Sequence, residues 1–105
     1  MSEEKKTKKN QINIELPEAI SEGVYSNLAI ISHSHSEFVI DFIRLLPNVP
    51  KAKVKSRIII TPEHAKRFLK ALADNVTKYE GQNGPIKVKG KNELPPMNFT
   101  PTAQA

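Results

Sequence analysis

The chain has 105 residues, a formal net charge of +5, and neither cysteine nor tryptophan. This length suits one domain, and the lack of cysteine excludes a disulfide framework, a thiolate zinc site and a cysteine nucleophile. No apolar run approaches the roughly 20 residues that cross a bilayer, and the charged N-terminus is unlike a secretory signal. We therefore expect a soluble, cytoplasmic protein.

Composition divides the chain into a core between two tails. Much of the positive charge lies in residues 1–10 and 84–105, and the second of these stretches is also rich in proline. Charged and proline-rich segments of this kind bury little apolar surface and are typically disordered. We predict disordered tails at 1–10 and 83–105 around a single domain at 11–82.

Four segments of the core have the alternation or the β-branched composition of strands. They are residues 11–16, 24–32, 37–45 and 53–60. Pro17 stops the first segment, residues 33–36 form a polar hairpin loop, and Pro47 and Pro50 bracket a turn. Since consecutive strands with short links usually pair with each other, we expect an antiparallel meander.

A helix follows the fourth strand. Thr61, Pro62 and Glu63 supply a capping hydroxyl, a preset first helical position and a negative charge near the positive end of the helix dipole. Apolar residues then recur at helical spacing and form one stripe, and Gly81 is placed to end the helix. The stripe consists of Ala65, Phe68, Leu69, Leu72, Val76 and Tyr79. The predicted fold is α+β: a four-stranded antiparallel meander followed by one long C-terminal amphipathic helix.

The expected sheet has two apolar faces. With the loop at 33–36, Ser32 pairs with Glu37, and the helix stripe is expected on the face of Ile31, Phe38, Ile40 and Phe42, which we call the aromatic face. The opposite face, which we call the partner face, holds Leu28, Ile30, Val39, Ile43 and Ile59. One helix covers only one face, and burying an aliphatic side chain contributes roughly 1.5–3 kcal/mol. We therefore predict a homodimer or higher symmetric oligomer that forms through the partner face or through the exposed sheet edge, and the partner face could also bind another protein. A monomer whose tails cover these residues is the alternative.

Few residues have the spacing of catalytic or metal-binding groups. His33, His35 and His64 could bind a metal only if the fold gathered them, and a solvated loop is the alternative. Glu37 and Asp41 lie about 13 Å apart along one strand, which is too far for a carboxylate pair that acts on one bond. No glycine-rich phosphate loop and no Gly-flanked serine is present. We expect no enzyme, no cofactor and no metal.

Charged residues of the third and fourth strands suggest two further interactions. Asp41 is expected to pair with Arg57 or Lys55 across the sheet. A basic set could contact a polyanion such as nucleic acid, although no aromatic residue is interleaved with it. The set consists of Lys51, Lys53, Lys55, Arg57, Lys66, Arg67 and Lys70. The alternative is a lysine-rich edge strand that blocks sheet-to-sheet aggregation.

Several segments of this sequence resemble a small bacterial family known only as a domain of unknown function. They are Tyr25-Ser-Asn-Leu-Ala-Ile-Ile-Ser-His-Ser-His-Ser-Glu-Phe-Val-Ile-Asp-Phe-Ile-Arg44, Pro47-Asn-Val-Pro50, Lys53-Val-Lys-Ser-Arg57 and Thr61-Pro-Glu-His-Ala-Lys66. The resemblance covers residues 11–82 and brings no established activity, so it implies no catalytic residue. The predicted strand order followed by a helix also looks like the protomer of the SecB export chaperone. That similarity implies an oligomer that holds extended polypeptide against apolar surface.

Three classes of function follow from the sequence. The first is a non-enzymatic, cytoplasmic, oligomeric module that binds protein or peptide. The second is an accessory nucleic-acid-binding protein that uses the basic strand and the tails. The third is a small-molecule or metal-dependent enzyme. Salt dependence separates the first two, because affinity for nucleic acid falls steeply with added salt and apolar peptide binding does not.

Overall fold

The computed structural model describes residues 11–89. The elements are α2 (Glu18–Ser21), β1 (Leu28–His33), β2 (Phe38–Ile43), β3 (Val54–Ile60) and α3 (Pro62–Asn83). The chain divides into two compact units, Met1–Pro62 and Glu63–Ala105, which we call the sheet unit and the helix unit and describe one after the other. The predicted tail at 1–10, and the part of the predicted C-terminal tail from residue 90 onward, lie outside the described residues.

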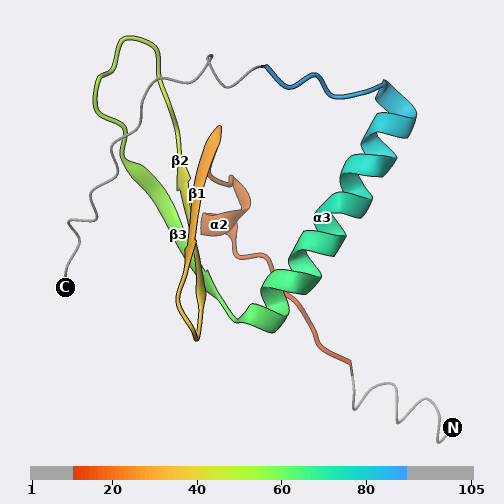
Figure 1. Ribbon diagram of the computed structural model, residues 1–105. Coiled ribbons are helices and arrows are strands. Elements are labelled where there is room, and N and C mark those ends of the chain that lie inside the picture. The colour runs from red at the N-terminus through yellow and green to blue at the C-terminus, as the bar shows by residue number, and fades with distance from the viewer. Residues whose placement is uncertain (1–10, 90–105) are drawn as a thin grey trace, which may run out of the picture. The chain divides into compact units, whose positions relative to one another are not determined.

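The sheet unit contains three antiparallel strands in the order β1-β2-β3 (Figure 1). Together with the long C-terminal helix they confirm the α+β class, but the prediction of a fourth strand is wrong. Residues 11–16 are not part of the sheet, and Ile12 and Ile14 are 81% and 91% exposed. Alternating sequence makes a segment able to pair, but a strand forms only beside an edge. In the described chain this segment lies against neither edge of the sheet.

The β1–β2 hairpin turns one residue later than predicted. Ser34 Oγ accepts hydrogen bonds from the N–H groups of Ser36 and Glu37, at 3.2 and 3.3 Å, and the Ser34 N–H donates to the Glu37 carbonyl at 2.9 Å. The loop is therefore 34–37, and Ser32 pairs with Val39 rather than with Glu37. Because this register differs from the predicted one by two residues, every side chain keeps its expected face.

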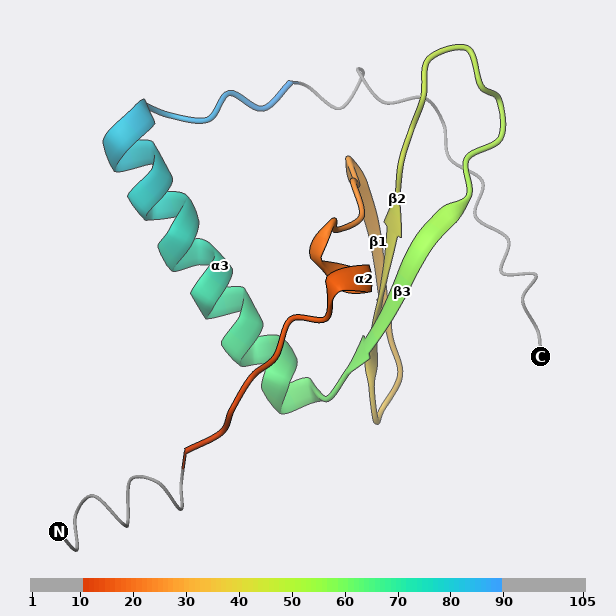
Figure 2. The same cartoon turned by 180° about the vertical axis from the view of Figure 1, so that it is seen from behind.

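The β2–β3 connection runs from Arg44 to Lys53 and projects at the end of the sheet opposite the hairpin (Figures 1 and 2). Its first half contains the predicted turn, in which the Val49 N–H donates to the Leu46 carbonyl at 3.3 Å. Asn48 adopts a φ of 64°. Proline followed by a residue with positive φ is the signature of a type II turn, and asparagine tolerates that backbone better than most residues.

An irregularity in β3 breaks the predicted alternation of that strand. Phe42 pairs with Ser56, whereas Ile43 pairs with Val54, so Lys55 is the additional residue of a β-bulge. The prediction placed Val54 and Ser56 on one side and Lys55 with Arg57 on the other. The bulge puts Val54 opposite Ile43 and Ser56 opposite Phe42, which face opposite sides of the sheet, so Val54 and Ser56 no longer share a face.

The core of the sheet unit centres on β2, which has a neighbour on both sides. Ile40 and Ile43 are 7% and 5% exposed, and Asp41 is 1% exposed. These three are the buried side chains of the described residues. So small a core leaves much of the driving force for folding to other contacts.

Helix α3 begins at the predicted residue, Pro62, and ends later than predicted. Gly81 lies inside α3, while Gly84, with a φ of 88°, follows the last helical residue and donates its N–H to the Glu80 carbonyl at 2.9 Å. The predicted end at Gly81 is therefore wrong, since the left-handed residue that ends the helix is the second glycine. No residue of α3 is buried. The expected packing of its apolar stripe on the aromatic face stays a prediction.

Candidate functional site

The centre of the partner face is an ion pair between Asp41 and Arg57. The two residues are paired across β2 and β3. Arg57 Nε donates to Asp41 Oδ1 at 2.6 Å, and Arg57 Nη2 donates to Asp41 Oδ2 at 2.8 Å. The carboxylate is 2% exposed and the guanidinium side chain 43%. This bidentate geometry confirms the predicted pairing and satisfies a charge that would otherwise be buried alone.

Arg57 also controls the ionisation of Asp41. Its hydrogen bonds lower the pKa of the carboxyl below the ordinary value of 3.8; burial opposes this by raising the pKa, and the positive charge of the guanidinium adds to the lowering. The pKa of Arg57 is raised, chiefly by the same hydrogen bonds. Asp41 is therefore held as an anion, and its bonds to Arg57 give it a structural role in the sheet.

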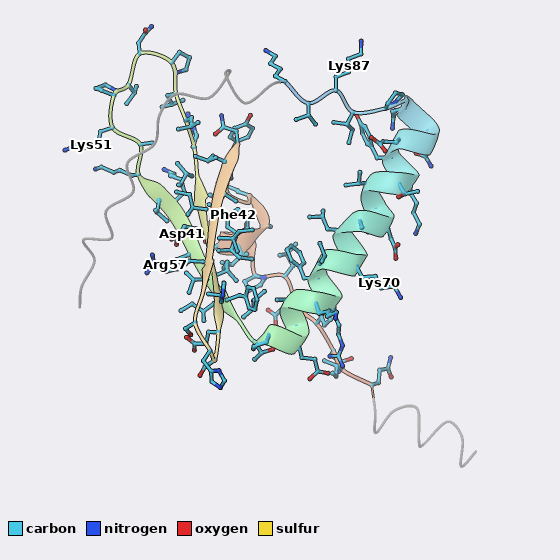
Figure 3. The ribbon with its side chains drawn as sticks, viewed as in Figure 1. Asp41, Phe42, Lys51, Arg57, Lys70 and Lys87 are labelled. Atoms are coloured by element: carbon cyan, nitrogen blue, oxygen red, sulfur yellow. The ribbon has the colours of Figure 1, made fainter. Side chains whose placement is uncertain are left out.

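The strand pairing gathers the five predicted residues of the partner face around this ion pair. Leu28 pairs with Ile43, Ile30 with Asp41, and Val39 with Ile59. In Figure 3, Asp41 and Arg57 lie on the opposite side of the sheet from Phe42. Ile43 is already buried and Ile59 is 55% exposed, while the other three are half-buried. The surface available to a partner is therefore narrower than the sequence suggested.

The two outer edges of the sheet differ in chemistry. The β3 edge carries Lys55 and Arg57, whereas β1 reads Leu-Ala-Ile-Ile-Ser-His and has no lysine, glutamate, aspartate, arginine or proline. The bond between Ser34 and Glu37 fixes which backbone groups face inward, so alternation directs the N–H groups of Ala29 and Ile31 to the outer side of β1. An edge strand without charge or proline is a ready template for another strand.

Four basic residues gather at the β2–β3 connection. Arg44, Lys51, Lys53 and Lys55 line an open hollow of about 260 Å³, whose apolar wall consists of Leu46, Val49 and Ala52. No acidic residue among residues 11–89 lines it. All four basic residues are exposed, and Figure 3 shows Lys51 reaching outward from the loop. Lys55 is also the additional residue of the β3 bulge.

The remaining residues of the predicted basic set lie elsewhere. Arg57 is bound to Asp41, and Arg67 forms an ion pair with Glu63 one turn earlier on α3. Lys66 and Lys70 also belong to the helix unit. The structure thus brings together three of the seven predicted residues and adds Arg44. Sequence reasoning missed Arg44 because it follows an apolar strand as a single charge, and only the return of the loop brings it near the lysines.

The three histidines have other surroundings. His33 stacks on Phe38, its cross-strand partner, with ring centroids 5.4 Å apart, and the ring of His64 lies 6.4 Å from that of Phe68. His35 lies in the hairpin loop. Within residues 11–89, no three histidine, cysteine or acidic side chains are grouped as metal ligands would be. The same part of the chain contains no helix with the length and apolar character to span a membrane.

Comparison with known proteins gives a family and nothing beyond it. No curated protein and no solved structure matches the chain, so the similarity to the SecB protomer stays a hypothesis, and its premise of four strands is wrong. A family model described as "Protein of unknown function (DUF3467)" matches residues 1–88. This range contains every described element and all the residues discussed above. The chain therefore belongs to the DUF3467 family.

Proposed function

We propose that this protein is a small, non-enzymatic binding module that forms a homo-oligomer and takes an extended polypeptide at the β1 edge. The observation that carries the proposal is the contrast between the two sheet edges. The β3 edge has the positive charge of Lys55, which discourages pairing, while β1 combines an uncharged edge with outward N–H groups. Added strands gain main-chain hydrogen bonds from such an edge and specificity from alternate side chains.

The chain carries a segment with the pattern that this edge would accept. Ile12, Ile14 and Leu16 alternate with polar residues and are 81%, 91% and 67% exposed. We propose that residues 11–16 of a second copy pair with β1 and extend the partner face. The exchange would bury these three side chains, and each contributes roughly 1.5–3 kcal/mol to stability when it is fully covered. Exchange of one element between identical protomers is a low-cost route to a dimer.

The same edge would receive a strand from another protein when the second copy is displaced. The partner then needs alternating apolar residues and few charges, because β1 offers no ion-pair partner of its own. Unfolded or extended segments have these properties, so a module that binds them at β1 would be chaperone-like. We also propose that the protein acts in the bacterial cytoplasm.

Sedimentation of full-length variants tests the oligomer. Wild type is expected to sediment as at least two protomers of 11.8 kDa. Ile14→Lys should give single protomers, since it places a charge on the apolar side of the segment. Glu15→Lys, on the polar side, is the matched control and should remain associated. Wild type that stays at one protomer's mass at micromolar concentration, or an equal response of both variants, contradicts the proposal.

A second variant tests the edge itself. Ala29→Pro removes an outward N–H from β1 and leaves the pairing with β2, because proline is tolerated where the N–H faces away from the ladder. The variant should lose self-association, and it should lose affinity for a synthetic peptide of residues 10–17, while its circular dichroism stays that of wild type. Unchanged peptide affinity in a folded Ala29→Pro protein would place the contact away from β1.

A further inference from the structure

The hollow at the β2–β3 connection has the composition of an anion site. Arg44, Lys51, Lys53 and Lys55 contribute four positive charges to its lining, and none of the described residues that line it carries a carboxylate that would neutralise them. Like charges so close together cost free energy through mutual repulsion unless a counter-ion is bound. Arg57, which lies in the same strand as Lys55, shows the contrast, because its charge is bound to Asp41.

The loop that forms the hollow is fixed at both ends. The Asn27 side chain accepts a hydrogen bond from the Leu45 N–H at 2.7 Å and donates to the Leu45 carbonyl at 3.1 Å. The turn at Asn48 then sets the direction in which the chain returns. At the far end, the bulge places Lys55 among the lining residues. A site held in this way loses less conformational entropy when an anion binds.

The size of the hollow limits its ligand. Pockets for cofactors and drug-sized molecules are about 300–1,000 Å³ and mostly enclosed, whereas this hollow is about 260 Å³ and open. In the part of the chain that the structure describes, its apolar wall is aliphatic and offers no aromatic ring on which a base could stack. Recognition therefore falls on charged oxygens, for which arginine offers a planar fork and lysine a mobile point charge.

We propose that this hollow binds consecutive phosphate groups of a polyphosphate chain or of a single-stranded nucleic-acid backbone. Arg44 binds one phosphate through two N–H groups, and the lysines approach its neighbours along the loop. The wall of Leu46, Val49 and Ala52 limits access of water from one side. Binding is independent of base sequence, because contacts to phosphate carry no sequence information directly. This site is separate from the β1 edge, so the two activities stand or fall independently.

The test uses full-length protein with two probes, inorganic tripolyphosphate and a twelve-nucleotide oligothymidylate. Amide NMR signals are followed at low salt, where weak phosphate binding is measurable. Perturbed signals should centre on residues 44–55. The double variant Arg44→Gln/Lys53→Gln should lose at least tenfold in affinity. Lys66→Gln/Lys70→Gln is the matched control, since it removes the same net charge from α3, and its affinity should change less than twofold.

The probes also separate the two sources of phosphate. Tripolyphosphate that binds as tightly as the oligonucleotide indicates a free polyphosphate, and tighter binding of the oligonucleotide indicates a nucleic-acid backbone; both outcomes support the site. Equal losses in the two double variants would show that only net charge matters and would overturn the proposal. So would signal changes spread over α3, or no binding of either probe to wild type at millimolar concentration.

Discussion

Asp41 offers the sharpest test of how this small sheet is stabilised. Replacing it with asparagine keeps the shape of the side chain but removes its charge, and it turns one acceptor of the Arg57 fork into an amide donor. Hydrogen bonds to charged groups contribute about 1.5–3 kcal/mol. Because Asp41 is 1% exposed, water cannot replace the lost bond. We expect Asp41→Asn to lower the free energy of unfolding by about 1.5–3 kcal/mol.

This loss should be measurable by several methods. In a domain of 60–100 residues, 1 kcal/mol shifts Tm by about 4–8 °C, so Asp41→Asn should lower Tm by roughly 6–24 °C. Urea unfolding followed by circular dichroism, at one protein concentration throughout, gives the free energy directly. Arg67→Gln is the control. It breaks the exposed pair with Glu63 and should cost no more than about 0.5 kcal/mol, as expected of surface pairs.

The effect of Asp41→Asn should also depend on pH in a defined direction. The folded-state pKa of Asp41 lies below its ordinary value of 3.8, so the charged carboxylate stabilises the fold above that value. The contribution is lost as pH falls through the lowered pKa. The stability difference between wild type and the variant should stay constant between about pH 5 and 7 and narrow below about pH 4. A difference that does not change with pH, or is absent at pH 7, would refute the role of this pair.

Two further substitutions probe the core and the helix end. Ile40→Ala should lower the free energy of unfolding by about 2–5 kcal/mol in urea, whereas its cross-strand partner Ile31, 63% exposed, should cost less than about 1 kcal/mol when changed to alanine; similar costs at both sites would contradict the burial pattern. Gly81→Ala should raise the free energy of unfolding, measured in the same urea titration, by about 0.5–1 kcal/mol, because it relieves the cost of glycine inside a helix. Gly84→Ala should lower this free energy by about 1–2 kcal/mol because of the φ of 88°. Open space surrounds both glycines, so a change of the same sign at both would show that backbone conformation is not the cause.

The elements whose residues carry local signals were predictable from the sequence. The start of α3 at Pro62, the three observed strands and the turn at Asn48 each follow from capping, alternation or turn chemistry. Whether residues 11–16 join the sheet was not predictable, because strand pairing depends on where a sheet edge lies and not on the sequence pattern alone. The end of α3 was misplaced because Gly81 and Gly84 are equally suited in composition, and only their backbone angles distinguish them.

The candidate sites divide in the same way. The ion pair between Asp41 and Arg57 was predictable, because opposite charges in adjacent strands tend to pair across a sheet. The gathering of Arg44 with the lysines was not, since it depends on a bulge at Lys55 that leaves no mark in the composition. The hydrogen bonds that hold the start of this loop come from Asn27, which lies far from it in the sequence, and no local sequence pattern predicts them.

The position of the hairpin turn restricts how relatives of this chain can vary. If the turn keeps its four residues, an insertion or deletion of two residues slides β1 along β2 but returns each side chain to its own face. A change of one residue would instead exchange the faces of Ile30 and Ile31. Insertions that keep the turn length should therefore come in even numbers, whereas other insertions should lengthen the loop and leave the strand pairing as it is.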